Sequence, residues 1–196
     1  MEVVKQQKAL NRTVSAIKKG EVVICPTDTF YGFLADALNK KAVEKIFKIK
    51  KRARQKPLPV FIKDIKMAKE LAEINEKQEK ILKKYWPGKY TFILKRKELR
   101  DVGDHTILWG VDKKTIALRI PKYKFLNDLL KKINKPLVQT SVNISGQASL
   151  TKIDDIIKQF GRTGIPTLII IGVDFKKSKP SKVLDLTSDK IKVLRK

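Results

Sequence analysis

Residues 115–141, TIALRIPKYKFLNDLLKKINKPLVQTS, predict a helix between two apolar strands. The runs TIALRI (115–120) and KPLVQTS (135–141) are predicted as core strands of one sheet, because short apolar runs bounded by turn residues are typical of buried strands. The segment YKFLNDLLKKI (123–133) between them is predicted as a helix. This stretch therefore predicts a mixed α/β fold.

Further helices are predicted on both sides of this stretch from apolar residues at helical spacing. Gly20 is expected to end the first helix, and Asn39 and Asn75 are expected as N-caps of later ones. Thr151 and Asp154 have the spacing of a capping box, with Thr151 as the N-cap. These helices are predicted over 7–20, 39–52, 64–86 (as two helices) and 151–160.

Further strands are predicted from short apolar runs. They cover 21–25, 58–62, 86–96, 166–172, 181–186 and 190–196. The sequence has no internal repeat, no low-complexity linker and no clear composition shift. A single domain spanning 1–196 is therefore expected.

The composition is strongly basic, with 45 Lys and Arg against 20 Asp and Glu, which gives a net charge of +25. Such a charge attracts anionic partners, including nucleotides, nucleic acid and acidic membrane surfaces. Because lysine occurs in every segment, a compositional habit of the source and a dedicated nucleic-acid surface both stay open.

The sequence has only one cysteine, Cys25, and one histidine, His105. This number is too small for a disulfide framework or a Cys/His zinc site. Cys25 lies in the apolar run VVIC and is expected to be a small buried residue. No segment approaches the ~18 consecutive apolar residues of a membrane span, and the N-terminus lacks a signal-peptide core. A cytoplasmic protein with no membrane contact is expected.

Five segments carry hydroxyl, amide or cationic groups beside predicted strands and are expected to form one anion-lined cleft. Arg119 ends an apolar strand, where a carboxylate or phosphate partner would be needed to offset burial. His105 lies in none of these segments, so no Ser-His-Asp set is available. The chemistry should therefore depend on positioning and electrostatics, as in nucleotidyl transfer. The segments are CPTDTFYG (25–32), KIKKRARQKPL (48–58), LRIP (118–121), QTSVNISGQAS (139–149) and KPSKVLDL (179–186).

Six motifs in this order resemble the YrdC-like family of L-threonylcarbamoyladenylate synthases. They are PTDTFYG (26–32), KKR…KPL (50–58), WPGKYTFIL (86–94), ALRIP (117–121), SVNISG (141–146) and PSKVLDL (180–186). The resemblance covers the chain from about Gly20 onward. It implies a twisted, mixed and mostly parallel sheet flanked by helices, with a deep basic concave cleft.

The resemblance also implies a reaction. L-threonine and bicarbonate would form N-carboxy-threonine, which attacks the α-phosphate of ATP to give threonylcarbamoyl-AMP and pyrophosphate. Mg²⁺ would be bound through the ATP phosphates. Partner transferase proteins would then move the threonylcarbamoyl group to N6 of adenosine 37 (the t6A modification) in tRNAs that read codons beginning with A.

By the same resemblance, individual residues take roles at the site. Lys50 and Arg52 would hold the ATP phosphates and offset charge on the leaving pyrophosphate, and they are the catalytic candidates. Lys56, Thr115, Asn143, Thr151 and Arg195 would also contact ATP. Thr29, Phe61, Arg119, Ser141 and Ser181 would contact threonine.

The sequence departs from the family pattern at two positions. Lys182 replaces a threonine, and Phe61 stands where some members carry a histidine, which leaves the details of substrate binding open. The additional C-terminal domain of long family members is not expected in this chain.

Two other functions compete with the synthase. One is a non-catalytic or weakly active RNA-binding relative of the same fold, which the basic surface favours and the low aromatic content of 7% disfavours. The other is the carbamoylation domain of hydrogenase maturation, which occurs in longer chains with zinc fingers.

Overall fold

The computed structural model describes residues 1–97, 107–172 and 179–195. In these residues the strands form one ten-stranded sheet, in the order β1-β8-β2-β3-β7-β4-β6-β5-β9-β10. The strands are β1 (Glu2–Lys5), β2 (Val23–Pro26), β3 (Tyr31–Asp36), β4 (Val60–Phe61), β5 (Tyr90–Lys95), β6 (Thr115–Arg119), β7 (Leu137–Ser141), β8 (Leu168–Ile171), β9 (Lys182–Asp185) and β10 (Lys192–Arg195). The helices are the 3-10 helix η1 (Gln6–Lys8), α1 (Leu10–Lys18), α2 (Lys40–Lys50), α3 (Ile65–Leu71), α4 (Glu76–Tyr85), α5 (Lys124–Ile133) and α6 (Ile153–Phe160).

The predicted strand–helix–strand segment 115–141 is confirmed as β6, α5 and β7. The two strands are separated in the sheet by β4, which runs parallel to β6 and antiparallel to β7. The mixed sheet is also confirmed, but "mostly parallel" is wrong. Among the described strands, five of the nine pairings are antiparallel. One reason is that short loops, such as the one between β2 and β3, can join only antiparallel neighbours.

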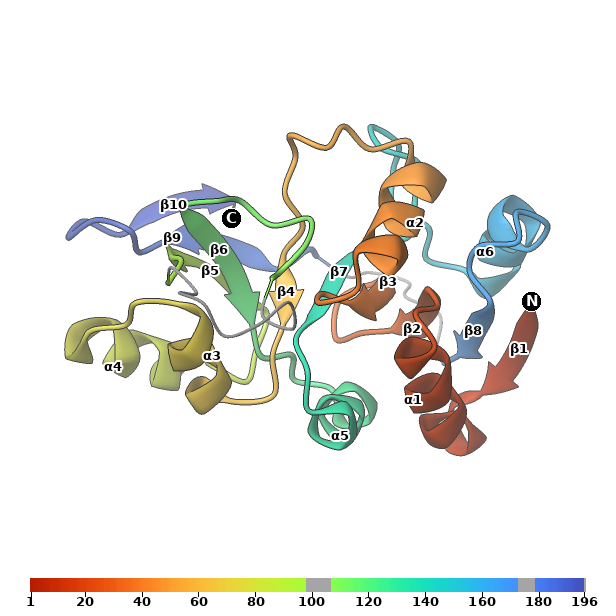
Figure 1. Ribbon diagram of the computed structural model, residues 1–196, viewed down its shortest axis with the longest axis horizontal. Helices are drawn as coiled ribbons and strands as arrows, with labels where there is room; N and C mark the ends of the chain where they lie inside the picture. The colour runs from red at the N-terminus through yellow and green to blue at the C-terminus, as the bar shows by residue number, and fades with distance from the viewer. Residues whose placement is uncertain (98–106, 173–178, 196) are drawn as a thin grey trace.

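Helices cover both faces of the sheet, so alternate strand residues enter two different cores. Val23, Cys25 and Leu34 pack in one core with α1 and α5, which lie side by side in Figure 1. Ile24 and Phe33 pack in the other core with α2 and α6. Helices α3 and α4 cover the part of the sheet that contains β5 and β6 (Figure 1).

Most of the predicted helix ends are confirmed by the cap geometry. The Asn39 side chain accepts a hydrogen bond from the Ala42 N–H, and Asn75 forms a reciprocal capping box with Gln78. Gly20 follows α1 with φ +75°, a conformation that favours glycine. Thr151 as an N-cap is wrong, because α6 begins at Ile153, its N-cap is Lys152, and no side chain caps it. Asp154 and Asp155 in its first turn instead place negative charge near the helix N-terminus.

Two strands were not predicted. β1 lies beside β8 at one edge of the sheet, and β3 follows the polar turn after β2. Gly32 lies within β3, opposite Cys25 of β2 and Ser141 of β7. A Cβ there would be 3.4 Å from the Thr27 side chain and 3.5 Å from the Thr140 carbonyl oxygen, which are ordinary van der Waals distances, so crowding does not require glycine at this position.

Candidate active site

Three arginines from distant parts of the chain line one cavity of about 230 Å³, which we call the arginine cavity. Arg52 follows α2, Arg119 ends β6 and Arg195 ends β10. None of the lining residues that the structure describes is acidic, so the cavity suits an anionic ligand. The other lining residues are Thr27, Thr29, Phe30, Tyr31, Gly32, Pro59, Gln139, Thr140, Ser141, Ser149, Pro180 and Ser181.

Arg119 is held in the wall of this cavity by a buried ion pair. Its Nη2 donates to Oδ1 of Asp28 at 2.5 Å, and its Nε donates to the Gly88 carbonyl oxygen at 3.0 Å. The Arg119 and Asp28 side chains are only 2% and 6% exposed. Burial lowers the pKa of Arg119, and the Asp28 carboxylate opposes that effect. The acidic partner that the sequence required of Arg119 is therefore Asp28, a residue of this chain.

Arg52 and Arg195 are held by neutral acceptors. Arg52 donates to the carbonyl oxygens of Lys56 and Pro57, at 2.9 and 3.0 Å. Arg195 donates from Nε to the Ser181 carbonyl oxygen at 2.8 Å and from Nη2 to the Ser181 hydroxyl at 3.0 Å. Within the described residues neither arginine forms an ion pair with an acidic side chain. Their charges are therefore oriented but not neutralised.

Hydroxyl groups complete the polar lining. The Thr27 hydroxyl donates to the Phe30 carbonyl oxygen and accepts from the Thr29 N–H, which fixes the turn between β2 and β3. The Thr29 hydroxyl lies 3.0 Å from that of Thr27. On the other side, the Ser181 hydroxyl lies 3.0 Å from that of Thr91. These contacts fix the position of two predicted threonine-binding residues, Thr29 and Ser181.

Lys50 and Asn143 lie behind the cavity rather than in its lining. The Lys50 ammonium donates to the carbonyl oxygens of Ser141 and Asn143, at 2.6 and 2.9 Å, and to Oδ1 of Asn143 at 2.8 Å. An ammonium has three N–H donors, so all three have acceptors within the protein. Burial, with a smaller contribution from Arg52, lowers the pKa of Lys50 to about 7. In this structure Lys50 supports the loop after β7 and has no donor directed to a phosphate.

The structure therefore brings together six of the predicted residues in the arginine cavity: Thr29, Arg52, Arg119, Ser141, Ser181 and Arg195. Phe61 lies beneath it, with its ring centre 5.6 Å from the Arg119 guanidinium carbon. Lys56 is exposed, and Thr151 lines neither this cavity nor the one beside it. The predicted deep concave cleft stays a prediction.

A second, more apolar cavity of about 250 Å³ adjoins the arginine cavity and shares Pro59 and Arg195 with it. It contains the predicted residue Thr115, whose hydroxyl donates to Oδ1 of Asp112. Val183 and Ala117 are among its apolar residues. The two cavities together offer a charged and an apolar compartment side by side.

Some lining residues were not predicted as site residues. Gln139 and Thr140 lie on β7 and Ser149 follows it, so their segment was singled out although their positions were not. Asp28 was recognised only as part of a polar loop. Its sequence separation from Arg119 gives no local signal for their ion pair.

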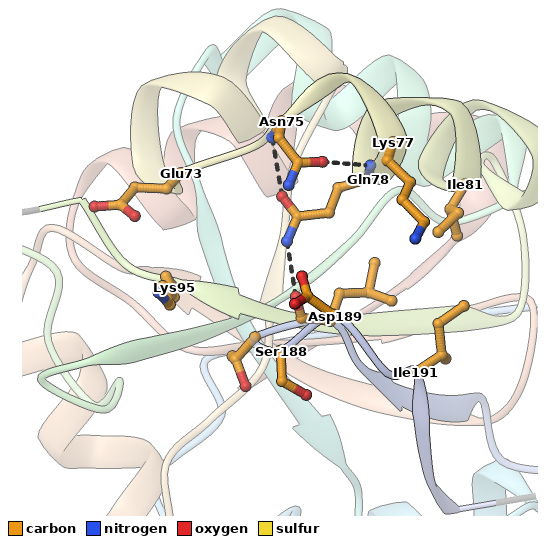
Figure 2. Close-up of a pocket in the computed structure, with 11 residues that line it drawn as sticks. Glu73, Asn75, Lys77, Gln78, Ile81, Lys95, Ser188, Asp189 and Ile191 are labelled. Atoms are coloured by element: carbon orange, nitrogen blue, oxygen red, sulfur yellow. Dashed lines mark hydrogen bonds between the residues drawn. The ribbon is translucent and has the colours of Figure 1, made fainter.

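A third cavity, of about 240 Å³, lies between the start of α4 and the turn from β9 to β10, and none of its described lining residues was predicted as a site residue (Figure 2). The residues that line it include two lysines, Lys77 and Lys95, and two acidic residues, Glu73 and Asp189. Gln78 donates to the Leu186 carbonyl oxygen at 2.7 Å across it. This contact ties the end of β9 to α4.

Other candidate chemistry is not supported in the part of the chain that the structure describes. Cys25 is fully buried, and burial raises the pKa of its thiol, which disfavours a thiolate. No cluster of three His, Cys, Asp or Glu side chains suits a metal ion in the described ranges, and His105 lies outside them. None of the described helices has the length and apolar character of a membrane span.

Comparison with known proteins gives the context for this site. The family model Sua5_yciO_yrdC, described as "Telomere recombination", matches residues 15–196. A putative threonylcarbamoyl-AMP synthase of Methanocaldococcus jannaschii is 38% identical over 191 residues, covering 97% of this chain and 86% of the relative.

Two solved structures have the same fold. Sua5 of Pyrococcus abyssi, complexed with L-threonine, matches all of this chain at 30% identity and a TM-score of 0.85, although the match spans only 57% of that protein. YciO of Escherichia coli matches 99% of this chain and 93% of its own at 27% identity, with a TM-score of 0.84. The chain therefore belongs to the Sua5/YciO/YrdC family.

Proposed function

We propose that this protein is an L-threonylcarbamoyladenylate synthase, a nucleotidyltransferase. It would convert L-threonine, bicarbonate and ATP into threonylcarbamoyl-AMP and pyrophosphate. The observation that carries the proposal is a cavity with three arginines and, among the residues that the structure describes, no acidic side chain in its lining. Relatives named as threonylcarbamoyl-AMP synthases and a family structure with bound L-threonine support the same reaction.

The two cavities divide the substrates by polarity. No acidic side chain in the described ranges forms an ion pair with Arg52 or Arg195, and these two arginines would hold the polyphosphate of ATP. The apolar cavity beside Arg195 would take the nucleoside, with Thr115 at its edge. Arg119, with Thr29, Ser141 and Ser181, would hold threonine. In this proposal the amino acid would lie beside the phosphates.

The protein's contribution to the reaction would be positioning and charge. An oxygen of the N-carboxylate (carbamate) group of N-carboxy-threonine attacks the α-phosphorus, and the bond from that phosphorus to the oxygen that bridges to the β-phosphate breaks, which releases pyrophosphate. The arginines stabilise negative charge that accumulates on the leaving group. Lys50 would act indirectly, by fixing the loop that carries Ser141 and Asn143.

Magnesium would enter with ATP as part of the substrate. The donors in the arginine cavity are guanidinium, hydroxyl and amide groups, which do not form a carboxylate site for Mg²⁺. A resident protein-bound Mg²⁺ is therefore not part of this proposal. The product would be passed to transferase proteins for t6A formation at position 37 of tRNA.

A pyrophosphate-release assay tests the proposal. Purified protein with ATP, Mg²⁺ and bicarbonate should release pyrophosphate only when L-threonine is added, and threonylcarbamoyl-AMP should be detected by mass spectrometry. L-Leucine at the same concentration is the control for amino-acid-independent hydrolysis. Pyrophosphate release that does not depend on threonine would contradict the proposal.

A weakly active or RNA-binding relative is the second candidate. The net charge of +25 favours it, and the chain also matches E. coli YciO, an uncharacterized protein, over almost its full length. A folded protein that lacks threonine-dependent turnover, but binds RNA with strong salt dependence, would support this alternative.

A further inference from the structure

The Arg119 site differs in charge from the rest of the arginine cavity. Asp28 pairs with Arg119 inside the protein, whereas Arg52 and Arg195 donate only to neutral oxygen atoms among the described residues. Asp28 does not itself line the cavity. The charge of the Arg119 guanidinium is therefore offset by the Asp28 carboxylate, which lies outside the lining and would not touch a ligand in the cavity.

Asp28 also fixes the orientation of Arg119. Its Oδ1 accepts from Arg119, and its Oδ2 accepts from the Lys122 N–H at 3.0 Å, so both carboxylate oxygens are engaged. Gly88 holds the guanidinium through Nε. These bonds use two of the five N–H donors of the guanidinium and leave others for a ligand in the cavity.

We propose that Asp28 is a positioning residue that divides the arginine cavity into two anion subsites. The Arg119–Asp28 pair has a low net charge, and Arg119 binds the single carboxylate of an amino acid by donating directed hydrogen bonds to it. Unpaired Arg52 and Arg195 carry the charge that attracts a polyphosphate. The inference rests on the proposed function for its two ligand classes, but it concerns how the site distinguishes them.

Asp28→Asn tests this division, because it keeps the size of the side chain and removes its charge. Binding is measured by calorimetry with L-threonine and, separately, with pyrophosphate. Threonine should bind about tenfold more weakly, because the neutral amide no longer fixes the orientation in which the Arg119 guanidinium meets the carboxylate. Pyrophosphate should bind about three- to tenfold more tightly, because Arg119 then adds an uncompensated charge to the cavity.

Opposite changes in the two affinities distinguish positioning from a structural role. If Asp28 only supports the fold, both ligands should bind more weakly, and that result would overturn the inference. Asp36→Asn is the matched control. Asp36 is also buried and paired, with Lys135, but lies at the far end of β3, about 16 Å from Tyr31. It should leave both affinities within about twofold.

The unaltered protein provides a second test that does not depend on whether Asp28→Asn folds. If the subsites are separate, saturating pyrophosphate should change the threonine dissociation constant by less than about threefold. Competitive displacement of threonine by pyrophosphate would overturn the inference. Normal turnover with competitive binding would contradict only this inference, whereas separate binding without turnover would contradict only the proposed function.

Discussion

Lys50 is almost fully buried, with only 2% of its surface exposed. Burial, together with the nearby positive charge of Arg52, lowers its pKa to about 7 in the folded protein. In the unfolded chain its pKa returns to about 10.4. Between these values the unfolded state binds a proton that the folded state has released. The contribution of Lys50 to stability therefore increases as the pH rises from about 7 toward 10.

Lys50→Met measures this contribution. The free energy of unfolding of the original protein minus that of the variant should increase by about 2 kcal/mol between pH 7 and pH 9. Urea denaturation at the two pH values gives both quantities, and other titrating groups cancel in the difference. A difference that is the same at both pH values would show that Lys50 keeps its proton in the folded protein.

The sequence predicted single residues best where the physical requirement was local. Arg119, at the end of an apolar strand, needed an anionic partner, and it has one. The identity of that partner could not be predicted, because the fold alone brings Asp28 to it. The family resemblance implied that Lys50 holds the ATP phosphates, and this role stays a prediction. The acceptors of the Lys50 ammonium come from residues 141–143, whose approach to the end of α2 has no signal in the sequence.

At the scale of elements, helices were predicted well because their caps are short-range. Asn39 and Asn75 could be identified from their positions before apolar repeats. The pairing of the strands could not be predicted, because the register and direction of each strand depend on contacts between distant segments of the chain. The short strand β4 shows this, since it pairs with both β6 and β7. Strand β3 was missed because its first residues, Tyr31 and Gly32, belong to a stretch with turn composition.

Helix α2 gives a prediction at this scale, because it leads to Lys50 and Arg52 at the site. Asn39→Ala should lower the free energy of unfolding by about 1 kcal/mol, since the Ala42 N–H loses its acceptor. Asn39→Ser retains an acceptor and should cost much less. Urea denaturation of both variants is the measurement. Equal destabilisation by Ala and Ser would mean that packing of the Asn39 side chain, and not its cap hydrogen bond, stabilises this end of α2.

At the scale of the whole molecule, the dominant electrostatic feature is a net charge of +25. Most of the excess lies outside the arginine cavity, because lysines occur in every segment. The many positive side chains repel one another in the folded protein. This repulsion lowers the stability of the folded state, and the effect is largest at low ionic strength. The site uses only a small part of this charge, and it does so through arginines fixed by specific hydrogen bonds.

Salt should therefore stabilise the protein. Raising NaCl from about 10 mM to about 150 mM shortens the screening length from about 30 Å to about 8 Å. We expect the melting temperature to rise by about 2–4 °C, which corresponds to about 1 kcal/mol for a chain of this length.

The Lys41→Glu, Lys66→Glu double variant lowers the net charge by 4 at exposed positions in the first turns of α2 and α3, which have no acidic residue. It should melt at a higher temperature in 10 mM salt and respond less to added NaCl. A melting temperature that falls with salt would mean that attractive ion pairs, such as Glu79 with Lys69 and Lys83, outweigh the repulsion.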